Sequence, residues 1–445
     1  MPETTSSCTS TSTKPGWPEL AALAYLALLP LNIQLRGPLF AHDLLVPVLV
    51  AAVLRSGRLR DAFRLPGLLL TVFLGLAGLA TLCHGLARRD LYELAIFAYM
   101  AVVFWFFRTV ELDRKRLHWL GLTILTVFCA YAAGQAVLGV HDTYAAYEGT
   151  TLGFMAKRFF FTFAHPNLAG SYYVLPVLCI MLAYYAGSGL GICNWLPANC
   201  KCQGLTPEWG LRLLLVGVLC VPLLLTVSRH MLISLAVILP FALGPVVGVR
   251  RGTVFPASGT VLALVFGLFY LTLLVPFFPL QREFPFFNHA TWGMYTIHQV
   301  VYGKMILLDL KSFFMGVGRA GVYDLYPQLV NVEGARAILA QYKSEFCMPA
   351  FTTYMDAHNE YLNLATAFGV PAMAACYAFW IAAAGAVPRR NRWHGLLCLF
   401  VAAVCLASLW DDLLSKRWIW ASLGILVGQA DRAAAATDKG EGHGS

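Results

Sequence analysis

Charge is what this 445-residue sequence has least of: Asp, Glu, Lys and Arg make up 12% of it, about half the usual share of ~25%. A soluble domain of this size needs a charged surface, so the scarcity excludes an ordinary soluble protein. A disordered chain would be far more polar, and a disulfide scaffold would be shorter and richer in cysteine than 12 residues in 445. A membrane protein with several spans is the class that remains.

Apolar residues, by contrast, make up 59% of the chain. At about 20 residues per helical span, they could supply about twelve helices. We therefore predict an all-α, polytopic integral membrane protein with about 12 transmembrane helices. The apolar runs that predict these spans are residues 17–33, 42–54, 65–86, 91–107, 117–138, 167–186, 211–226, 231–247, 255–278, 361–387, 395–409 and 418–428.

Basic residues outnumber acidic ones by 32 to 23, which gives a formal net charge of +9. In a membrane protein such a surplus usually sets orientation, so no nucleic-acid partner is expected. Of the Lys and Arg residues in the short connections, fifteen fall on one side of the predicted membrane and eight on the other. The richer side should be cytoplasmic, and both termini then lie in the cytoplasm.

This orientation leaves one long connection, residues 279–357, on the outer, periplasmic side. Long loops in compact proteins are usually functional. Apolar residues at helical spacing predict an amphipathic helix over residues 291–314, lying on the membrane or capping the bundle. The predicted segments are a disordered cytoplasmic N-terminus (1–16), spans one to nine (17–278), the long periplasmic loop (279–357), spans ten to twelve (358–430) and a cytoplasmic tail (431–445).

Some cations on the outer side are not explained by orientation, and they fall in polar motifs. Arg158 precedes His-Pro-Asn at residues 165–167, and Arg229 follows Ser228 in a tight turn between two apolar runs. A guanidinium at the membrane edge is costly unless it pairs with an anion or with carbonyl groups, and its planar fork suits phosphate. The alternative is an arginine that snorkels to the lipid headgroups.

A third motif, Asp-Ala-His-Asn-Glu-Tyr-Leu at residues 356–362, opens the tenth predicted span. Histidine is the usual general base near neutral pH, which makes His358 a catalytic candidate. Asp356 or Glu360 could hold its imidazole in one tautomer. The alternative interpretation is a hydrogen-bonded polar residue without a catalytic role.

Signatures of several other chemistries are missing from the sequence. It contains no P-loop, no Gly-x-Ser-x-Gly and no His-Glu-x-x-His, and no Asp-x-Asp pair on the predicted outer side. A metal-dependent nucleotide-sugar transferase is therefore disfavoured. Polar residues deep in several helices, which are typical of transporters and channels, are also few. We expect no metal site and no cofactor.

At its outer motifs the chain resembles the O-antigen ligase family, within the larger group of polytopic O-antigen ligases and polymerases. Four stretches carry the resemblance, in order, between residues 157 and 375. They are Arg158 with His165-Pro166-Asn167; Ser228-Arg229; Gly316-Val317-Gly318; and His358-Asn359-Glu360-Tyr361-Leu362 followed by Gly369.

The resemblance implies a reaction in lipopolysaccharide biosynthesis at the periplasmic face of the bacterial inner membrane. A preassembled glycan would pass from undecaprenyl pyrophosphate to a sugar hydroxyl of lipid A-core, without a metal and with inversion at the anomeric carbon. The partners would be these two lipids and the surrounding membrane lipids. His358 would be the general base, and Arg158 and Arg229 would be catalytic residues that bind the pyrophosphate. The supporting residues would be Asn167, Ser228, Asn359, Glu360 and Tyr361.

One departure from the family concerns a second phosphate ligand. Family members often carry an arginine upstream of the Gly-x-Gly turn, where this sequence offers His298 and Lys304, with Arg282 earlier. Arg319, directly after the turn, could supply the missing guanidinium. Arg282 and Arg319 are therefore both candidates for donor binding.

Other functions fit the same motifs. An O-antigen polymerase uses the same donor with a second lipid-linked glycan as acceptor, and a protein O-oligosaccharyltransferase attaches the glycan to a protein. A flippase for lipid-linked glycan is the rival from another class; it should show alternating-access pseudo-symmetry and need no outer histidine. A membrane scaffold without catalysis is the remaining alternative.

Overall fold

The structure is a computed structural model of the chain. It describes residues 15–31, 33–36, 39–57, 64–140, 142–143, 157–158, 170–185, 214–220, 234–240, 259–260, 264, 290–341, 356–389, 391, 393–409 and 411–441.

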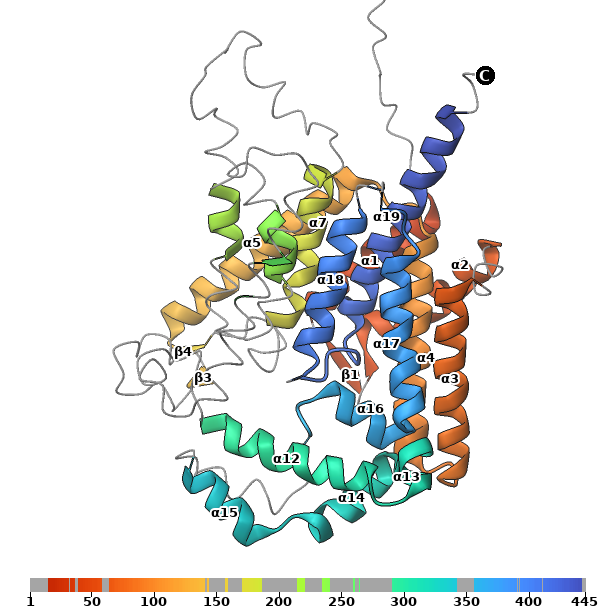
Figure 1. Ribbon diagram of the computed structural model, residues 1–445. Helices are drawn as coiled ribbons and strands as arrows, with labels where there is room; N and C mark the ends of the chain where they lie inside the picture. The colour runs from red at the N-terminus through yellow and green to blue at the C-terminus, as the bar shows by residue number, and fades with distance from the viewer. Residues whose placement is uncertain are drawn as a thin grey trace, which may run out of the picture.

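The described part of the chain is built almost entirely from helices, so the all-α prediction is confirmed (Figure 1). Two pairs of short antiparallel strands are the exception: β1 (Gln34–Arg36) with β2 (Leu39–Phe40), and β3 (Asp142–Thr143) with β4 (Lys157–Arg158). The helices of the N-terminal half are α1 (Trp17–Leu28), η1 (Leu29–Leu31), η2 (Ala41–Leu45), α2 (Val46–Arg55), α3 (Leu65–Cys83), α4 (Arg88–Thr109), α5 (Arg114–Leu138) and α7 (Val174–Tyr185).

The second half contains two groups of helices. Those of the predicted long loop are α12 (Ala290–Ile306), α13 (Leu310–Met315), α14 (Gly318–Leu329) and α15 (Val332–Gln341), and we call them the cross layer. Those that follow it are α16 (Glu360–Phe368), α17 (Val370–Gly385), α18 (His394–Ala407) and α19 (Arg417–Glu441).

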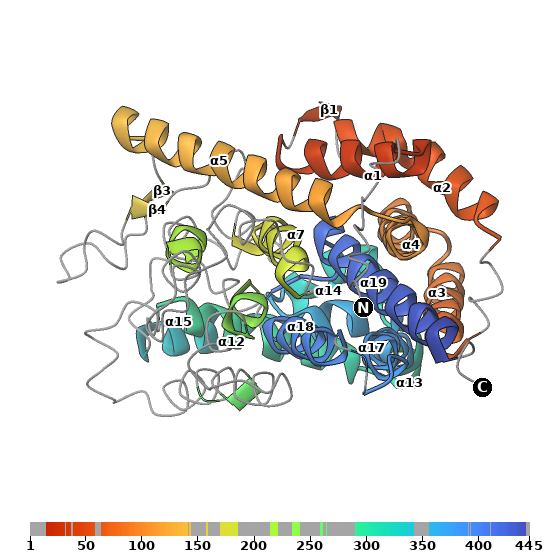
Figure 2. The ribbon, with the colours of Figure 1, turned by 90° about the horizontal axis from the view of Figure 1, so that it is seen from above.

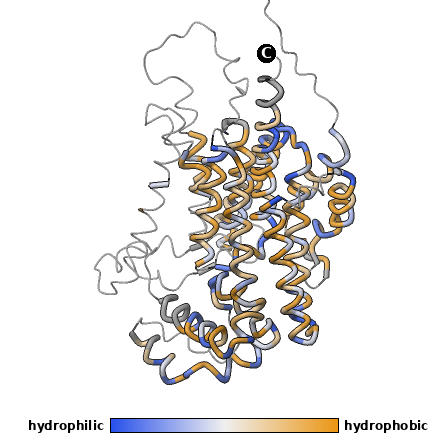
Figure 3. Tube along the Cα trace, turned by 45° about the vertical axis from the view of Figure 1, so that its right-hand side comes forward, coloured by the Kyte–Doolittle hydropathy of each residue, from blue (hydrophilic) through white to orange (hydrophobic). Residues whose placement is uncertain are grey.

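Among the helices that the structure describes, three, namely α3, α4 and α5, are long and apolar enough to cross a membrane. Four shorter apolar segments accompany them: Trp17–Leu31, Gly170–Leu182, Val370–Gly385 and His394–Ala407. Along the bundle most residues are apolar, and hydrophilic residues gather toward its two ends (Figure 3). The chain therefore has the character of a membrane protein, while the full number of about twelve spans stays a prediction.

The long helices pack in pairs around a large apolar core, which we call the bundle core. Helix α19 lies along α4, α17 along α3, and α5 along α7 (Figures 1 and 2). The cross layer runs across one end of this bundle, and α19 ends at the opposite end (Figure 1). A second and smaller core, the layer core, lies between α12 and α14 and consists of Ile297, Val301, Tyr302, Met305, Val322, Tyr326, Ala335 and Ala357.

Two predicted helices are each divided in the structure. The amphipathic helix expected over 291–314 is broken between α12 and α13, because Asp309 caps α13 by accepting a hydrogen bond from Ser312 N at 2.6 Å. The apolar run expected over 361–387 is divided at Gly369, which has a φ of 90°. A left-handed glycine ends one helix and lets the next begin in a new direction.

Candidate functional site

The segment 356–360 connects the cross layer to the bundle, and four of its residues are held by different neighbours. Asp356 Oδ2 lies 3.8 Å from the Arg319 guanidinium of α14, and Ala357 is fully buried in the layer core. The Asn359 side chain caps α16 by accepting from its third helical N–H at 3.1 Å, and Glu360 N donates to the Ser408 carbonyl at 2.8 Å. The residue between these anchors is His358.

His358 has a left-handed backbone with a φ of 47°. Among the described residues only one other non-glycine residue, Leu86, has a positive φ. A left-handed conformation costs an L-residue roughly 1–2 kcal/mol and persists where the surroundings determine it. Here the anchored neighbours on both sides impose it, so the histidine is held in one backbone geometry.

A second histidine lies within electrostatic range of His358. His298 of α12 is fully buried, and its Nδ1 is hydrogen-bonded to the hydroxyl of Tyr326, which is itself 1% exposed. Burial, and then the neighbouring His358, lower the pKa of His298 to about 4 against the opposing effect of Asp356. His298 is therefore neutral at pH 7.

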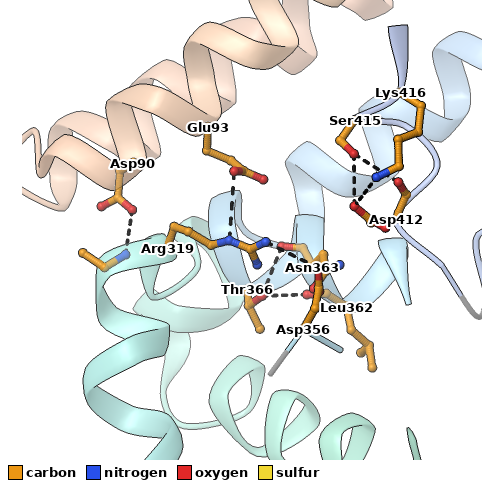
Figure 4. Close-up of polar contacts among 11 residues, drawn as sticks. Asp90, Glu93, Arg319, Asp356, Leu362, Asn363, Thr366, Asp412, Ser415 and Lys416 are labelled. Carbon is orange, nitrogen blue, oxygen red and sulfur yellow. Dashed lines mark hydrogen bonds and ion pairs between the residues drawn. The ribbon is translucent and has the colours of Figure 1, made fainter. Parts of the chain in front are cut away.

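Carboxylates and cations gather beside this segment at the junction of the cross layer and the bundle (Figure 4). The Arg319 guanidinium lies between Glu93 of α4, at 4.0 Å, and Asp356, at 3.8 Å. Glu360, 2% exposed, lies within electrostatic range of Glu93, Asp356 and Asp412.

An ion pair from the turn before α19 borders the same cluster. Lys416 Nζ donates to Asp412 Oδ2 at 2.8 Å, and Ser415 Oγ lies 3.2 Å from the same oxygen (Figure 4). Burial alone would lower the pKa of Lys416, but the adjacent carboxylate outweighs it and raises that pKa above its usual range. Asp412 therefore has a cationic partner, Lys416, four residues along the chain.

The turn between α3 and α4 holds the start of α14 against the bundle. Asp90 Oδ1 accepts a hydrogen bond from Ala320 N at 3.0 Å, and His84 Nε2 lies 3.1 Å from the Gly316 carbonyl oxygen. A Cβ on Gly318, which has a φ of 77°, would lie 2.7 Å from both Asp90 Oδ2 and His84 Nδ1. Only glycine fits at position 318, which gives the second glycine of the Gly-x-Gly motif a structural reason.

The Gly-x-Gly turn also meets the end of α16. Val317 N donates to the Thr366 carbonyl at 2.8 Å. A Cβ on Gly369 would clash with the Phe314 carbonyl at the end of α13. Two motifs that are about fifty residues apart in the sequence are therefore in direct contact.

The structure brings together the predicted site residues that lie between positions 319 and 361. Arg319 lies against Asp356, and Asn359 and Glu360 hold the start of α16. Tyr361 packs against neighbouring helices: its hydroxyl donates a hydrogen bond to the Cys405 carbonyl of α18 at 2.9 Å, and its ring stacks on Tyr377 of α17. The predicted residues Asn167, Ser228, Arg229 and Arg282 lie outside the described residues.

Of Arg158 the structure describes the backbone, which belongs to β4 and pairs with Asp142.

Within the described ranges no group of three or more His, Cys, Asp or Glu side chains could hold a metal ion.

The sequence did not predict Glu93, Asp412 and Lys416 as parts of this site. It offered His298 only in place of an arginine upstream of the Gly-x-Gly turn, and did not predict its hydrogen bond to Tyr326. One signal was available: Asp90 and Glu93 are three residues apart, and so share one face at the start of a predicted span. Carboxylates are rare at such a place without a function or a partner.

The cluster therefore combines a geometrically fixed histidine with the buried carboxyl group of Glu360, the partly buried carboxylates of Glu93 and Asp356, and the partly buried guanidinium of Arg319. Such an arrangement can remove a proton from a hydroxyl group and stabilise the resulting imidazolium ion. Compared with models of known protein families, the sequence matches none, and it matches none of the characterised proteins with which it was compared.

Proposed function

We propose that the protein is a membrane glycosyltransferase of the O-antigen ligase kind. It transfers a preassembled glycan from undecaprenyl pyrophosphate to a sugar hydroxyl of lipid A-core at the outer face of the inner membrane. The order of the four sequence motifs suggests this reaction, and the apolar, helical character of the chain is compatible with two lipid substrates.

In the proposed reaction His358 is the general base. The acceptor hydroxyl oxygen attacks the anomeric carbon from the face opposite the pyrophosphate, and its proton passes to the imidazole. The bond between the anomeric carbon and the phosphate oxygen breaks, and its electron pair leaves with undecaprenyl pyrophosphate. Pyrophosphate is a good leaving group, so fixed cations such as Arg158 and Arg229 suffice to stabilise its developing charge.

The observation that carries the proposal is the left-handed backbone of His358 between anchored neighbours. Strained backbone conformations concentrate at functional sites, because holding a reacting group in one geometry lowers the barrier. Asp356, two residues away, is a carboxylate that can stabilise the imidazolium ion formed when the base accepts its proton.

The test is a ligation assay with purified protein, lipid-linked glycan and lipid A-core. We expect His358→Asn to lower the rate by roughly 10²–10⁴-fold, as for other general bases. Asparagine tolerates the left-handed region well, so the variant should keep its fold. Leu86→Asn is the matched control, since it changes the other left-handed residue and should retain the wild-type rate. A wild-type rate for His358→Asn would refute the assignment of the base.

A second candidate, flipping of a lipid-linked glycan, is favoured by the partly buried carboxyl group of Glu93 and the buried one of Glu360. Ionisable side chains at membrane-spanning helices often mark ion or proton pathways. Measuring transfer in detergent, where no compartments exist, separates the two functions. Product that depends on His358 supports the transferase, whereas transport by vesicles that form no product in detergent supports the flippase.

A further inference from the structure

One group of buried polar atoms near His358 is not used by the proposed base chemistry. Asn363 is 5% exposed, and neither its amide nitrogen nor its amide oxygen has a hydrogen-bond partner among the described residues. Leaving a buried polar group without a partner costs about 1–3 kcal/mol. An amide buried in this way is well suited to a ligand that completes its hydrogen bonds.

Two further atoms of the same kind belong to the same stretch of chain as Asn363. Asp356 Oδ1 and Glu360 Oε2 also have no hydrogen-bond partner among the described residues. Glu360 and Asn363 are three residues apart on α16, so they share one face of that helix. In Figure 4, Asn363 and Asp356 lie beside the Arg319 guanidinium, which also faces Glu93.

The chemistry of these atoms selects the class of ligand. The two oxygens of a carboxyl group accept hydrogen bonds, and its protonated form also donates one, as an amide does. The matching ligand must therefore offer several donors and at least one acceptor, as the neighbouring hydroxyls of a sugar do. Phosphate oxygens would meet three carboxyl groups, Glu93, Asp356 and Glu360, and one guanidinium that two of them already face, which disfavours an anion at this place.

We propose that Asp356, Glu360 and Asn363, with Glu93 behind Arg319, form a subsite that binds hydroxyl groups of the acceptor saccharide. This proposal rests on the proposed function and extends it by separating the two substrates. The donor pyrophosphate is bound by arginines elsewhere, and the acceptor is held by an acidic face next to the base. His358 lies between Asp356 and Glu360 in the chain, so this segment both binds the acceptor and removes its proton.

The first measurement is of binding without any donor. Purified protein in detergent is titrated with lipid A-core, and its thermal unfolding is followed. Lipid A-core should raise the unfolding temperature of the wild type, and Asn363→Leu should need about tenfold more of it, since two neutral hydrogen bonds are lost. Without ligand the leucine variant should be as stable as the wild type or more so, because an unpartnered buried amide has been removed.

Ser422→Ala is the matched control. Ser422 is also fully buried, and its hydroxyl has no hydrogen-bond partner among the described residues, but it lies on α19 away from the cluster. Its variant should bind lipid A-core as the wild type does. Unchanged binding by both Asn363→Leu and Glu360→Gln would overturn the subsite. So would stabilisation by pyrophosphate or by a divalent cation alone that the same variants abolish.

The second measurement uses the ligation assay. The Asn363→Leu and Glu360→Gln variants should raise KM for the acceptor about tenfold and leave KM for the donor unchanged. If no transfer is found but acceptor binding depends on Asn363, the subsite stands and the proposed reaction fails. If transfer proceeds and both variants keep the wild-type acceptor KM, the subsite fails and the reaction stands.

Discussion

At the scale of one residue, burial keeps the imidazole of His298 neutral. Its ring is enclosed by α12, α14 and the segment before α16, and the groups that face it are Tyr326, His358 and Asp356. A neutral imidazole at this place leaves His358 as the histidine that can accept a proton without a second positive charge beside it. The two histidines therefore differ in their proposed roles: His298 is a neutral, hydrogen-bonded neighbour, and His358 is the proton acceptor.

This burial predicts a defined dependence of stability on pH. The pKa of His298 is about 4 in the folded protein and about 6.5 in an unfolded chain. Because the unfolded state binds the proton more readily, the free energy of unfolding should fall as pH decreases from 6.5 to 4, by up to ~3 kcal/mol. Thermal unfolding in detergent between pH 7.5 and 4.5 measures the effect. His298→Gln should flatten this part of the curve, and an unchanged slope would contradict the assignment.

The histidine segment was predictable because its signal is local. A histidine followed by Asn and Glu just before an apolar run combines a base, a helix cap and a carboxylate within three residues. The spacing of Asp90 and Glu93 marks a polar helix face but not the residues that it meets, and Lys416 gave no signal of this kind. Both Glu93 and Lys416 lie far from residue 358 in the sequence and reach the cluster only through packing of α4 and of the turn before α19. The unpartnered amide of Asn363 is a property of its surroundings, which no sequence pattern contains.

At the scale of elements, the contact between α13 and the α16–α17 junction positions the cross layer. Gly369 allows this contact because it combines a positive φ with the absence of a side chain beside the Phe314 carbonyl. The apolar run alone predicted an uninterrupted helix here, because the reason for the break lies in α13, more than fifty residues earlier. Helix positions follow from local apolar runs, whereas helix breaks of this kind follow from tertiary contacts.

We therefore expect Gly369→Ala to displace α13 and to destabilise the protein by about 1–3 kcal/mol. Its ligation rate should fall as well, since α13 packs on α16, the helix that follows His358. Gly303→Ala in α12 is the control: no atom lies within 4 Å of its added Cβ, and alanine favours a helix by roughly 0.5–1 kcal/mol. Thermal unfolding compares the two variants, and equal stability would contradict the packing argument.

At the scale of the whole molecule, the cross layer and the α4–α5 connection lie at opposite ends of a helix long enough to span a membrane. Asp90, near the start of α4, contacts α14, and Glu111 lies just beyond the end of α4. The charge distribution predicts that the cross-layer end is periplasmic and the other end cytoplasmic.

Cysteine labelling in intact cells tests this orientation. In a cysteine-free background, Leu310→Cys on the exposed side of α13 should react with a membrane-impermeant maleimide, because Leu310 is 77% exposed. Glu111→Cys should react only after the inner membrane is opened. The reverse pattern would place the cluster on the cytoplasmic side and remove it from a periplasmic reaction.

The apolar cores of the bundle and the cross layer meet at His358. Ala357 belongs to the layer core, and Glu360 N is bonded to Ser408 at the end of α18. A tilt of the layer against the bundle would therefore change the backbone torsions around the histidine, along with the contacts of α13 and α14 with the bundle. The orientation of the imidazole therefore depends on how the cross layer packs against the bundle. If His358 is the general base proposed above, ligation should depend on docking of the cross layer onto the bundle, and a lipid bound between the two should lower the rate without contacting the histidine.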